Sequence, residues 1–232
     1  MKQLLKHLAS FIPALQYRRS YAKDHLDQRL EPFIGKRGGF FLEAGANDGI
    51  SQSNTLYFER YFGWTGILVE PAPALAALCR KYRPKCIVEE VALASRINSG
   101  PVELTIAGLM TTTAGAFADM EGYSADKHLE RAKTFSLNNT EEFEKLYANT
   151  NTISQILENH GSPEIDLLSL DVEGYEEEAL MGLDLSKHRP HHILIEERYE
   201  HSFQNILGSY YRKEAILAFS EFYQDTLYKL KE

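Results

Sequence analysis

The sequence predicts an α/β fold with a doubly wound, mostly parallel sheet and helices on both faces. Short apolar runs recur along the chain, and most are followed by a segment with apolar residues at helical spacing. This alternation is typical of βαβ units, in which parallel strands are buried by helices on both sides. The first run also ends in a glycine-bracketed turn, as expected where a strand reaches the carboxyl edge of such a sheet. The expected strands are 40–44, 67–69, 87–93, 102–106, 164–170 and 192–196.

The first strand leads into the turn Gly45-Ala46-Asn47-Asp48-Gly49. Glycine at both ends lets the backbone turn tightly and lets a ligand approach where a Cβ atom would clash. The spacing Gly-x-x-x-Gly differs from the Gly-x-Gly-x-x-Gly of a pyrophosphate site, so a nicotinamide cofactor is less favoured. The acid Glu43 before the turn suits a cationic ligand such as S-adenosylmethionine. The alternative is a plain turn that binds nothing.

Two helices flank the second strand. Ser53 or Asn54 can cap the first helix, whose apolar face carries Leu56, Tyr57 and Tyr61. The strand 67–69 follows and ends at Glu70. Pro71 and Pro73 then open the second helix, whose apolar face carries Leu75, Leu78, Cys79 and Tyr82.

The middle of the chain, residues 107–150, has poor periodicity and is rich in Thr, Gly, Asn and charged residues. It is too long for a simple connection, so we expect an insertion that acts as a lid or binds the substrate. The chain is therefore divided into an N-terminal helical extension, residues 1–35, and one main domain, residues 36–232, which contains this insertion at about 107–150.

The last third returns to alternating elements. A short helix with Ile153, Ile156 and Leu157 precedes the strand 164–170, which ends at Asp171. A further helix through Ala179 leads to the strand 192–196. The tail, residues 210–230, is expected to begin as a helix that carries Ala215, Ile216 and Phe219 and to end as a weak strand or hairpin.

Composition and charge narrow the function. Of the 232 residues, 44% are hydrophobic and 25% are charged, as in an ordinary globular protein. The net charge of -8 argues against nucleic acid as the main partner. The cysteines Cys79 and Cys86 make neither a disulfide framework nor a zinc site, which fits a reducing cytoplasm.

The first residues predict an amphipathic helix with Leu4, Leu8, Phe11 and Leu15 on one face. Lys6 and His7 interrupt what would be the apolar core of a signal peptide, so export is not expected, and no run of the sequence is long enough to span a bilayer. The favoured interpretation is that this helix packs on its own domain. A peripheral contact with a membrane or a lipid-linked substrate is the alternative.

Acidic residues stand at the carboxyl ends of the expected strands, where open α/β sheets bind ligands. They are Glu43, Glu70, the group Asp171, Glu173 and Glu176, and the pair Glu196 and Glu197. One acid in such a place can be a helix cap. Several gathered along one edge repel one another unless a cationic cofactor or a metal ion offsets their charge. Glu70 follows the glycine turn at the distance typical of an acid that accepts hydrogen bonds from the ribose of an adenosine.

Two sets of motifs extend this picture. The first comprises Gly45-Ala-Asn-Asp-Gly49, Ser53-Asn54-Thr55, Phe58-Glu59, Gly63-Trp64, Gly66 and Val69-Glu70-Pro71. The second comprises Ile165-Asp166-Leu-Leu-Ser-Leu-Asp171-Val-Glu173-Gly174-Tyr-Glu176 and Leu180-Met-Gly182. In this order they resemble the FkbM family of S-adenosylmethionine-dependent methyltransferases. The resemblance implies a class I, Rossmann-like methyltransferase fold and methyl transfer to a hydroxyl of a sugar, a polysaccharide or a related metabolite.

The resemblance also implies roles for single residues. Gly45, Asn47 and Gly49 would line the methionine part of S-adenosylmethionine, with Glu43 near its amino group. Glu70 would hold the ribose. The turn that ends at Ala92 would flank the adenine.

Methyl transfer to an alcohol needs a general base or a Lewis-acid metal, because an alcohol is a poor nucleophile until its proton leaves. Asp171 is the first candidate, as base or as metal ligand, and Glu173 is the second. Asp171, Glu196 and Glu197 form an oxygen-rich set suited to Mg²⁺ or a similar cation. His128 in the insertion is either a base that reaches over the site or a solvated helix residue.

Two alternative functions come from other classes. A catalytically silent relative would keep the fold as a binding or scaffold module, but a scaffold does not need acids at the sheet edge. A nicotinamide-dependent dehydrogenase is disfavoured by the missing third glycine.

Overall fold

The computed structural model describes residues 18–97, 100–117, 123–135, 143–198 and 203–232. Within these residues the central sheet has seven strands in the order β11-β12-β10-β9-β1-β2-β3. Their bounds are β1 Phe40–Ala44, β2 Thr65–Val69, β3 Ile87–Glu89, β9 Leu167–Leu170, β10 His192–Arg198, β11 Tyr211–Phe219 and β12 Tyr223–Leu230.

The sheet is doubly wound about β1. From β1 the chain moves outward to β2 and β3, and it later returns to β9 and β10 on the other side of β1. All of these neighbours pair in parallel, and β12 pairs antiparallel with both β10 and β11. The predicted mostly parallel sheet is therefore confirmed. The direction of winding reverses between β1 and β9, which is where such sheets bind ligands.

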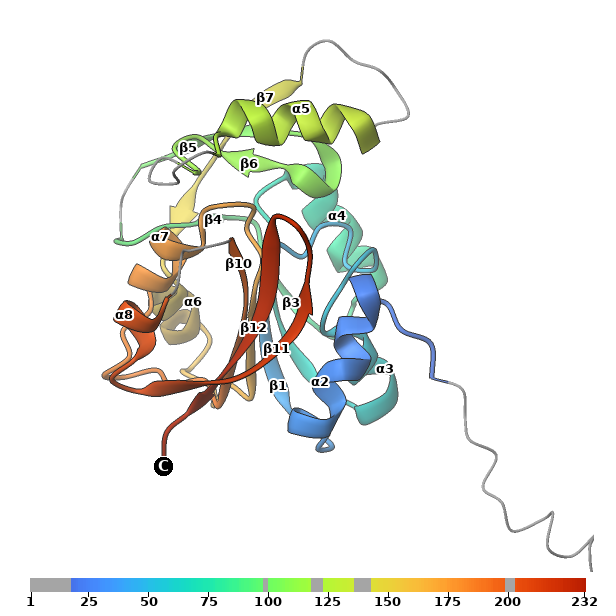
Figure 1. The fold of residues 1–232 in the computed structure, drawn as a ribbon, viewed down its shortest axis with the longest axis vertical. Helices are drawn as coiled ribbons and strands as arrows, with labels where there is room; N and C mark the ends of the chain where they lie inside the picture. The colour runs from blue at the N-terminus through green and yellow to red at the C-terminus, as the bar shows by residue number, and fades with distance from the viewer. Residues whose placement is uncertain (1–17, 98–99, 118–122, 136–142, 199–202) are drawn as a thin grey trace, which may run out of the picture.

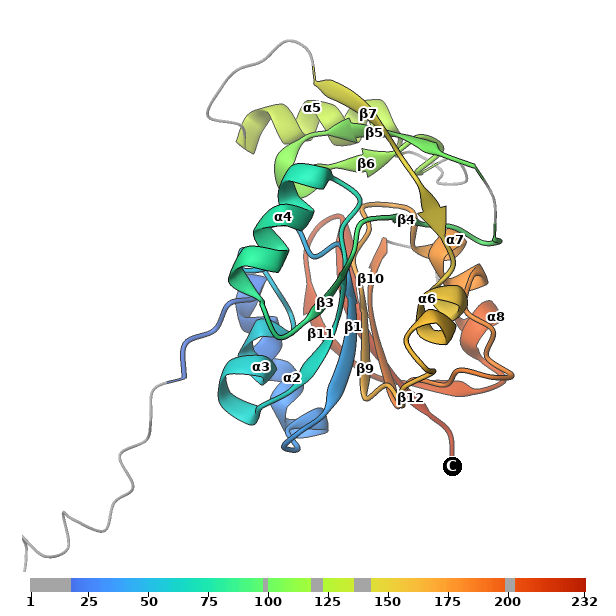
Figure 2. The same ribbon diagram turned by 180° about the vertical axis from the view of Figure 1, so that it is seen from behind.

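Helices cover both faces of the sheet (Figures 1 and 2). On one side lie α2 Leu26–Ile34, α3 Leu56–Phe62 and α4 Pro73–Tyr82, and on the other lie α6 Ile153–Asn159, α7 Glu176–Met181 and α8 Gln204–Leu207. Side chains of a strand point alternately to the two faces. Phe41 accordingly packs in the core under the first group of helices, and Leu42 packs in the core under the second. Because both faces are buried, the strands appear in the sequence as continuous apolar runs.

The insertion and the expected strand before it, 102–106, form a small layer of their own above the carboxyl ends of the strands (Figure 1), and the whole segment from residue 102 is called the insertion from here on. Strands β6 Thr112–Thr113, β5 Val102–Ile106 and β7 Glu144–Ala148 make an antiparallel sheet in that order. The turn η2 Gly108–Met110 and helix α5 Ala125–Phe135 belong to the same segment. The expected strand 87–93 is divided, because β4 Ala92–Leu93 leaves the central sheet and pairs with β8 Thr150–Asn151.

The predicted helix in the tail is wrong. Residues 211–219 form strand β11, which pairs with β12 as an antiparallel hairpin. The register shifts between Lys213 and Ala215 and again between Ile216 and Ala218. Each irregularity breaks the strict alternation that marks a strand in a sequence, so the apolar residues come to stand at helical spacing.

The N-terminal extension packs on the domain from residue 18 onward. A single turn, η1 Lys23–His25, precedes α2, whose Leu26, Leu30 and Ile34 are buried in the core. The amphipathic helix expected within the first fifteen residues lies outside the described residues. Among the residues that are described, no helix is both long and apolar enough to cross a membrane.

Candidate functional site

The turn after β1 and the end of β9 are in direct contact. Gly45 has φ +83°, and a Cβ atom there would lie 1.8 Å from the carbonyl oxygen of Asp171. Glycine is therefore required by the approach of two protein segments. Asn47 also adopts a left-handed conformation, with φ 50°, and its backbone N–H donates to a carboxylate oxygen of Glu70 at 2.8 Å.

Glu70 closes the end of β2 and is 5% exposed. Its second carboxylate oxygen accepts a hydrogen bond from the backbone N–H of Ala72 at 2.9 Å. Burial raises the pKa of Glu70 to about 7, although the two backbone N–H groups of Ala72 and Asn47 lower it. Near neutral pH this carboxyl group is therefore populated in both its ionised and its neutral form.

The loop after β9 carries the predicted catalytic acids. Glu173 is left-handed, with φ 52°, and its carbonyl oxygen accepts from the hydroxyl of Thr112 at 3.0 Å. A Cβ atom at Gly174 would lie 2.1 Å from the ring of Phe117, so the insertion packs tightly on this loop. The conformation of Asp171 and Glu173 therefore depends on the insertion as well as on β9.

Glu176 binds the backbone of the same loop through its carboxylate. It is 3% exposed, and one carboxylate oxygen accepts from the backbone N–H groups of Val172 at 3.0 Å and Gly174 at 3.2 Å. Burial and the nearby charge of Asp171 raise the pKa of Glu176. Its buried position and its bonds make it a positioning residue for the loop.

A first cavity of about 90 Å³ lies between these loops. It is lined by the predicted residues Gly45, Asn47, Glu70, Ala92, Asp171 and Glu173. Residues of the insertion, from Leu104 to Thr113, form its cover. Pockets for drug-sized ligands typically measure about 300–1,000 Å³, so a nucleoside can enter only if this cover moves outward.

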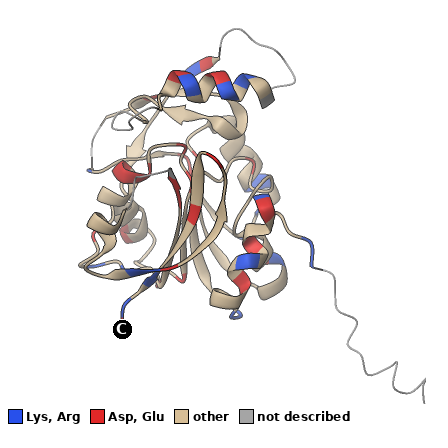
Figure 3. Ribbon diagram, in the orientation of Figure 1, with Lys and Arg blue, Asp and Glu red and all other residues tan. Residues whose placement is uncertain are grey.

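A second cavity of about 640 Å³ adjoins the first and shares Gln52, Gly108, Leu109 and Glu173 with it. The insertion supplies an apolar wall of Ile106, Leu109, Met110, Ala132 and Phe143. The opposite wall is polar and includes Lys23, Asp24, Glu196, Ser220 and Tyr223. Figure 3 shows acidic residues on the strands below the insertion and charges of both signs on helix α5.

Two predicted cofactor residues lie outside both cavities. Glu43 is 3% exposed, and its carboxylate accepts hydrogen bonds from the backbone N–H of Asn54 at 2.8 Å and the hydroxyls of Ser53 and Thr55. The guanidinium of Arg83 lies 3.5 Å away. At Gly49 a Cβ atom would meet Arg83 and Cys79 of helix α4.

The structure does not bring the predicted metal ligands Asp171, Glu196 and Glu197 together. Successive residues of a strand point to opposite faces, so Glu196 lines the second cavity while Glu197 is buried at 1% exposure beneath the hairpin. The Glu197 carboxylate accepts hydrogen bonds from Lys213, Gln224, Thr226 and Tyr228. The described residues contain no group of three or more such side chains that could hold a metal ion. The predicted metal site formed by these three residues is therefore wrong.

His128 is neither solvated nor in contact with either cavity. It is fully buried, its Nε2 atom lies 3.1 Å from the carbonyl oxygen of Met110, and Nδ1 lies 3.3 Å from the hydroxyl of Tyr123. Because a carbonyl oxygen only accepts, Nε2 carries a hydrogen. The same Nε2 is 3.4 Å from Glu173, so His128 can orient that carboxylate.

Sequence reasoning missed the residues that reach the second cavity from distant parts of the chain. Lys23 precedes the domain, Gln52 follows the glycine turn, and Tyr223 belongs to the hairpin. None belongs to a recognisable motif. The one available signal was the sequence Ser220-Glu221-Phe222-Tyr223, in which a serine marks a turn before an aromatic strand start.

Solved structures with similar folds include several methyltransferases. A TehB-like SAM-dependent methyltransferase from Corynebacterium glutamicum is 13% identical, the match covers 99% of this chain and 96% of that chain, and the TM-score is 0.46. An O-methyltransferase from Bacillus cereus, solved in complex with SAH, is 15% identical over 99% of this chain and 89% of that chain, with a TM-score of 0.43. At such TM-scores neither likeness supports a conclusion about substrate.

Sequence comparison assigns the family. A search of curated proteins returned no match. The methyltransferase FkbM domain, by contrast, matches residues 43–230, which contain the whole central sheet except the first residues of β1. The chain therefore belongs to the FkbM methyltransferase family and has the class I methyltransferase fold.

Proposed function

We propose that the protein transfers the methyl group of S-adenosylmethionine to a hydroxyl of a sugar, a polysaccharide or a related metabolite. The observation that carries the proposal is the meeting of the two cavities at Glu173 and Gln52, at the carboxyl edge of the sheet. The smaller cavity would receive the methyl donor and the larger one the acceptor. Reacting atoms held on the two sides of this junction would be aligned for direct transfer.

The charge of the first cavity supports a cationic cofactor. Its described lining includes the carboxyl groups of Glu70, Asp171 and Glu173 and no Lys, Arg or His. Such a set is stabilised by a ligand that carries a sulfonium and an ammonium group. Glu70 would accept hydrogen bonds from the ribose hydroxyls, Gly45 and Asn47 would face the methionine part, and Ala92 would flank the adenine. Glu43 would act indirectly, by fixing residues 53–55 beside the turn.

The reaction needs a donor of the methyl group and an acceptor of one proton. When bound, S-adenosylmethionine supplies a methyl carbon to the acceptor oxygen, and the electron pair of the broken carbon–sulfur bond stays on sulfur. Asp171 or Glu173 would take the proton of the acceptor hydroxyl, because both carboxyl groups line the first cavity and Glu173 also lines the second. No step is assigned to a metal, since the predicted ligands point to different sides of the sheet.

The second cavity fits a carbohydrate better than a purely apolar alcohol. Its apolar wall suits the C–H face of a pyranose ring, and its opposite wall offers donors and acceptors for ring hydroxyls. A strongly anionic acceptor is disfavoured by Asp24, Glu173 and Glu196 in the same wall.

A radiolabelled methyl-transfer assay over a panel of glycosides, glycans and small alcohols tests the proposal. We expect label in a carbohydrate product, and mass spectrometry of that product should show a methyl ether, which survives mild alkali. Label found only on amines or as alkali-labile esters would contradict transfer to a hydroxyl. Calorimetry with S-adenosylmethionine separates this proposal from the silent scaffold, because a silent scaffold should give no heat of binding.

A further inference from the structure

The segment before α2 is held in one conformation by a buried carboxylate. Asp27 is fully buried, and its oxygens accept from the hydroxyl of Ser20 at 2.6 Å and the backbone N–H groups of Tyr21 at 2.6 Å and Ala22 at 3.2 Å. An additional bond comes from the N–H of Gln28 at 2.8 Å. A buried carboxylate with these partners ties residues 20–22 to the start of the helix.

This anchoring supports a strained turn. Asp24 and His25 adopt φ values of 49° and 59°, so two successive non-glycine residues are left-handed. Such conformations cost free energy and persist only where the surroundings determine them. Their effect here is to bring Lys23 and Asp24 to the second cavity. Ala22 also forms a β-bridge with Gln52, which lines both cavities.

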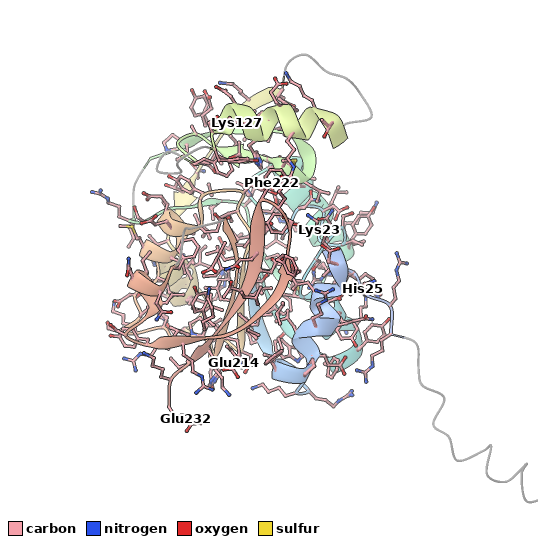
Figure 4. All side chains as sticks on the ribbon, in the orientation of Figure 1. Lys23, His25, Lys127, Glu214, Phe222 and Glu232 are labelled. Atoms are coloured by element: carbon pink, nitrogen blue, oxygen red, sulfur yellow. The ribbon has the colours of Figure 1, made fainter. Side chains whose placement is uncertain are left out.

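Lys23 stands between the acids of the site and the hairpin. Its Nζ atom lies 4.5 Å from the centre of the Tyr223 ring. Burial lowers the pKa of Lys23, but Tyr223, Glu196 and Asp171 raise it and prevail. The side chain is therefore a fixed cation beside the proposed acceptor. Figure 4 shows Lys23 near the turn of the hairpin that carries Phe222.

We propose that the segment 20–25 is part of the acceptor site and that Lys23 determines acceptor specificity. The proposal rests on the proposed function. The Lys23 ammonium donates a hydrogen bond to one hydroxyl oxygen of the acceptor, and Glu196 accepts from a neighbouring hydroxyl. The acceptor class is a neutral sugar with adjacent hydroxyls, because the lining contains two cations, Lys23 and Arg131, against the three acids Asp24, Glu173 and Glu196. The segment precedes residue 43, where the family match begins, so this contact is a feature of this chain beyond the matched domain.

Lys23→Met tests the proposal, because it keeps the apolar stem and removes the ammonium. Lys81→Met is the matched control: Lys81 also stands over a tyrosine ring, with its Nζ atom 5.1 Å from the centre of Tyr82, but it lines neither cavity. Methyl glycosides of neutral sugars and a methyl glucuronide serve as acceptors. We expect Lys23→Met to raise KM for the best neutral glycoside about tenfold or more, as for a lost charge-assisted hydrogen bond. The Kd of S-adenosylhomocysteine and the urea midpoint should stay unchanged, Lys23→Arg should recover part of the loss, and Lys81→Met should behave as the parent.

Unchanged KM in Lys23→Met, a glucuronide preferred by the parent protein, or an equal effect of Lys81→Met would each overturn the proposal. Its failure is separable from failure of the proposed function. If no glycoside is methylated, binding of the same glycosides to the S-adenosylhomocysteine complex is measured by saturation-transfer NMR. Binding that is lost in Lys23→Met supports the role of Lys23, whereas equal binding in both proteins, or no binding to either, overturns it.

Discussion

The two buried glutamates Glu43 and Glu70 have very different environments. Glu43 is compensated by Arg83 and hydroxyl donors, whereas Glu70 has two backbone N–H partners and no cation among its hydrogen-bond partners. Burial raises the pKa of Glu70 to about 7, against the opposing effect of its backbone N–H partners. Of these two acids, therefore, only Glu70 retains the capacity to respond to a cationic ligand.

Glu70 should make cofactor binding depend on pH. Its folded pKa of about 7 lies above the ordinary value of 4.5, so the stability that the neutral form contributes is lost as the pH rises from 4.5 through 7. The ionised form accepts ribose hydroxyls better, so affinity for S-adenosylhomocysteine should rise several-fold, up to about tenfold, between pH 6 and pH 8. Glu70→Gln should remove most of this slope, and Glu70→Ala should weaken binding by about 1–3 kcal/mol. Calorimetry at both pH values checks this, and parallel slopes in parent and Glu70→Gln would contradict it.

Asp171→Asn should lower kcat by about two orders of magnitude or more, as expected when a general base is lost. The amide is nearly isosteric, so the free energy of unfolding from urea denaturation should remain within about 0.5 kcal/mol of the parent. Single-turnover kinetics with saturating cofactor measures the effect. Parent-like turnover in Asp171→Asn, together with a slow Glu173→Gln, would transfer the role of base to Glu173.

The sequence located these acids but not their partners. The strand ends at Glu43, Glu70 and Asp171 could be predicted, because a buried strand has a short apolar signature. Arg83 could not be identified as the partner of Glu43, because it follows helix α4, 40 residues away along the chain from Glu43 on strand β1, and no local pattern links the two. For the same reason the sequence placed Glu43 in one cluster with the other acids of the sheet edge. In the structure Glu43 is paired with Arg83, apart from Glu70, Asp171 and Glu173 on the first cavity.

At the scale of the elements, the buried guanidinium of Arg83 links the end of helix α4 to the start of helix α3. Arg83, just after α4, is fully buried and donates to Glu59, the carbonyl oxygen of Gly49 at 3.1 Å and the hydroxyl of Thr55 at 3.1 Å. The Cys79 thiol on the same helix donates to the carbonyl oxygen of Asn47 at 2.9 Å. These contacts fix the segment that lines the first cavity.

Arg83→Met should destabilise the protein by about 3–5 kcal/mol, because it leaves Glu43 and Glu59 buried without a counter-charge. Arg80→Met is the control. Arg80 lies on the same helix in an exposed pair with Glu90, so its loss should cost less than about 1 kcal/mol. Urea denaturation compares the two, and similar midpoints for both variants would contradict a stabilising role of the buried network.

The hairpin β11–β12 depends on a second buried carboxylate. Hydrogen bonds from Thr226, Tyr228 and Gln224 outweigh burial and lower the pKa of Glu197. A lowered pKa adds stability that is present above the ordinary value of 4.5 and is lost as the pH falls through the folded value. The first strand of the hairpin, β11, was hidden from the sequence by its two register shifts. The end of the tail was expected as a weak strand or hairpin, and the neighbouring strand β10 was predicted from a continuous apolar run.

Adjacent residues of β10 provide a direct test of strand orientation. Glu197→Gln should lower stability at pH 7 by about 1–3 kcal/mol, and the difference from the parent should shrink as the pH falls below 4.5. Glu196→Gln should leave stability unchanged and raise KM for the acceptor. Denaturation curves and steady-state kinetics of both variants check this. A stability loss in Glu196→Gln together with a raised KM in Glu197→Gln would contradict the orientation described.

At the scale of the whole molecule, three segments distant in the sequence enclose one site. The sheet edge supplies Glu70 and Asp171, the insertion supplies the cover, and the N-terminal segment supplies Lys23. The sheet could be predicted because its strands are locally encoded. The second cavity could not, because its walls exist only once the insertion has packed over the edge through contacts such as Phe117 on Gly174.

A crystal structure with S-adenosylhomocysteine bound tests the central claim most directly. The ribose hydroxyls should lie about 3 Å from the carboxylate of Glu70. The sulfur should face the second cavity beside Glu173, and residues 108–113 of the insertion should have moved outward. A nucleoside bound elsewhere, or a sulfur turned away from that cavity, would contradict the account.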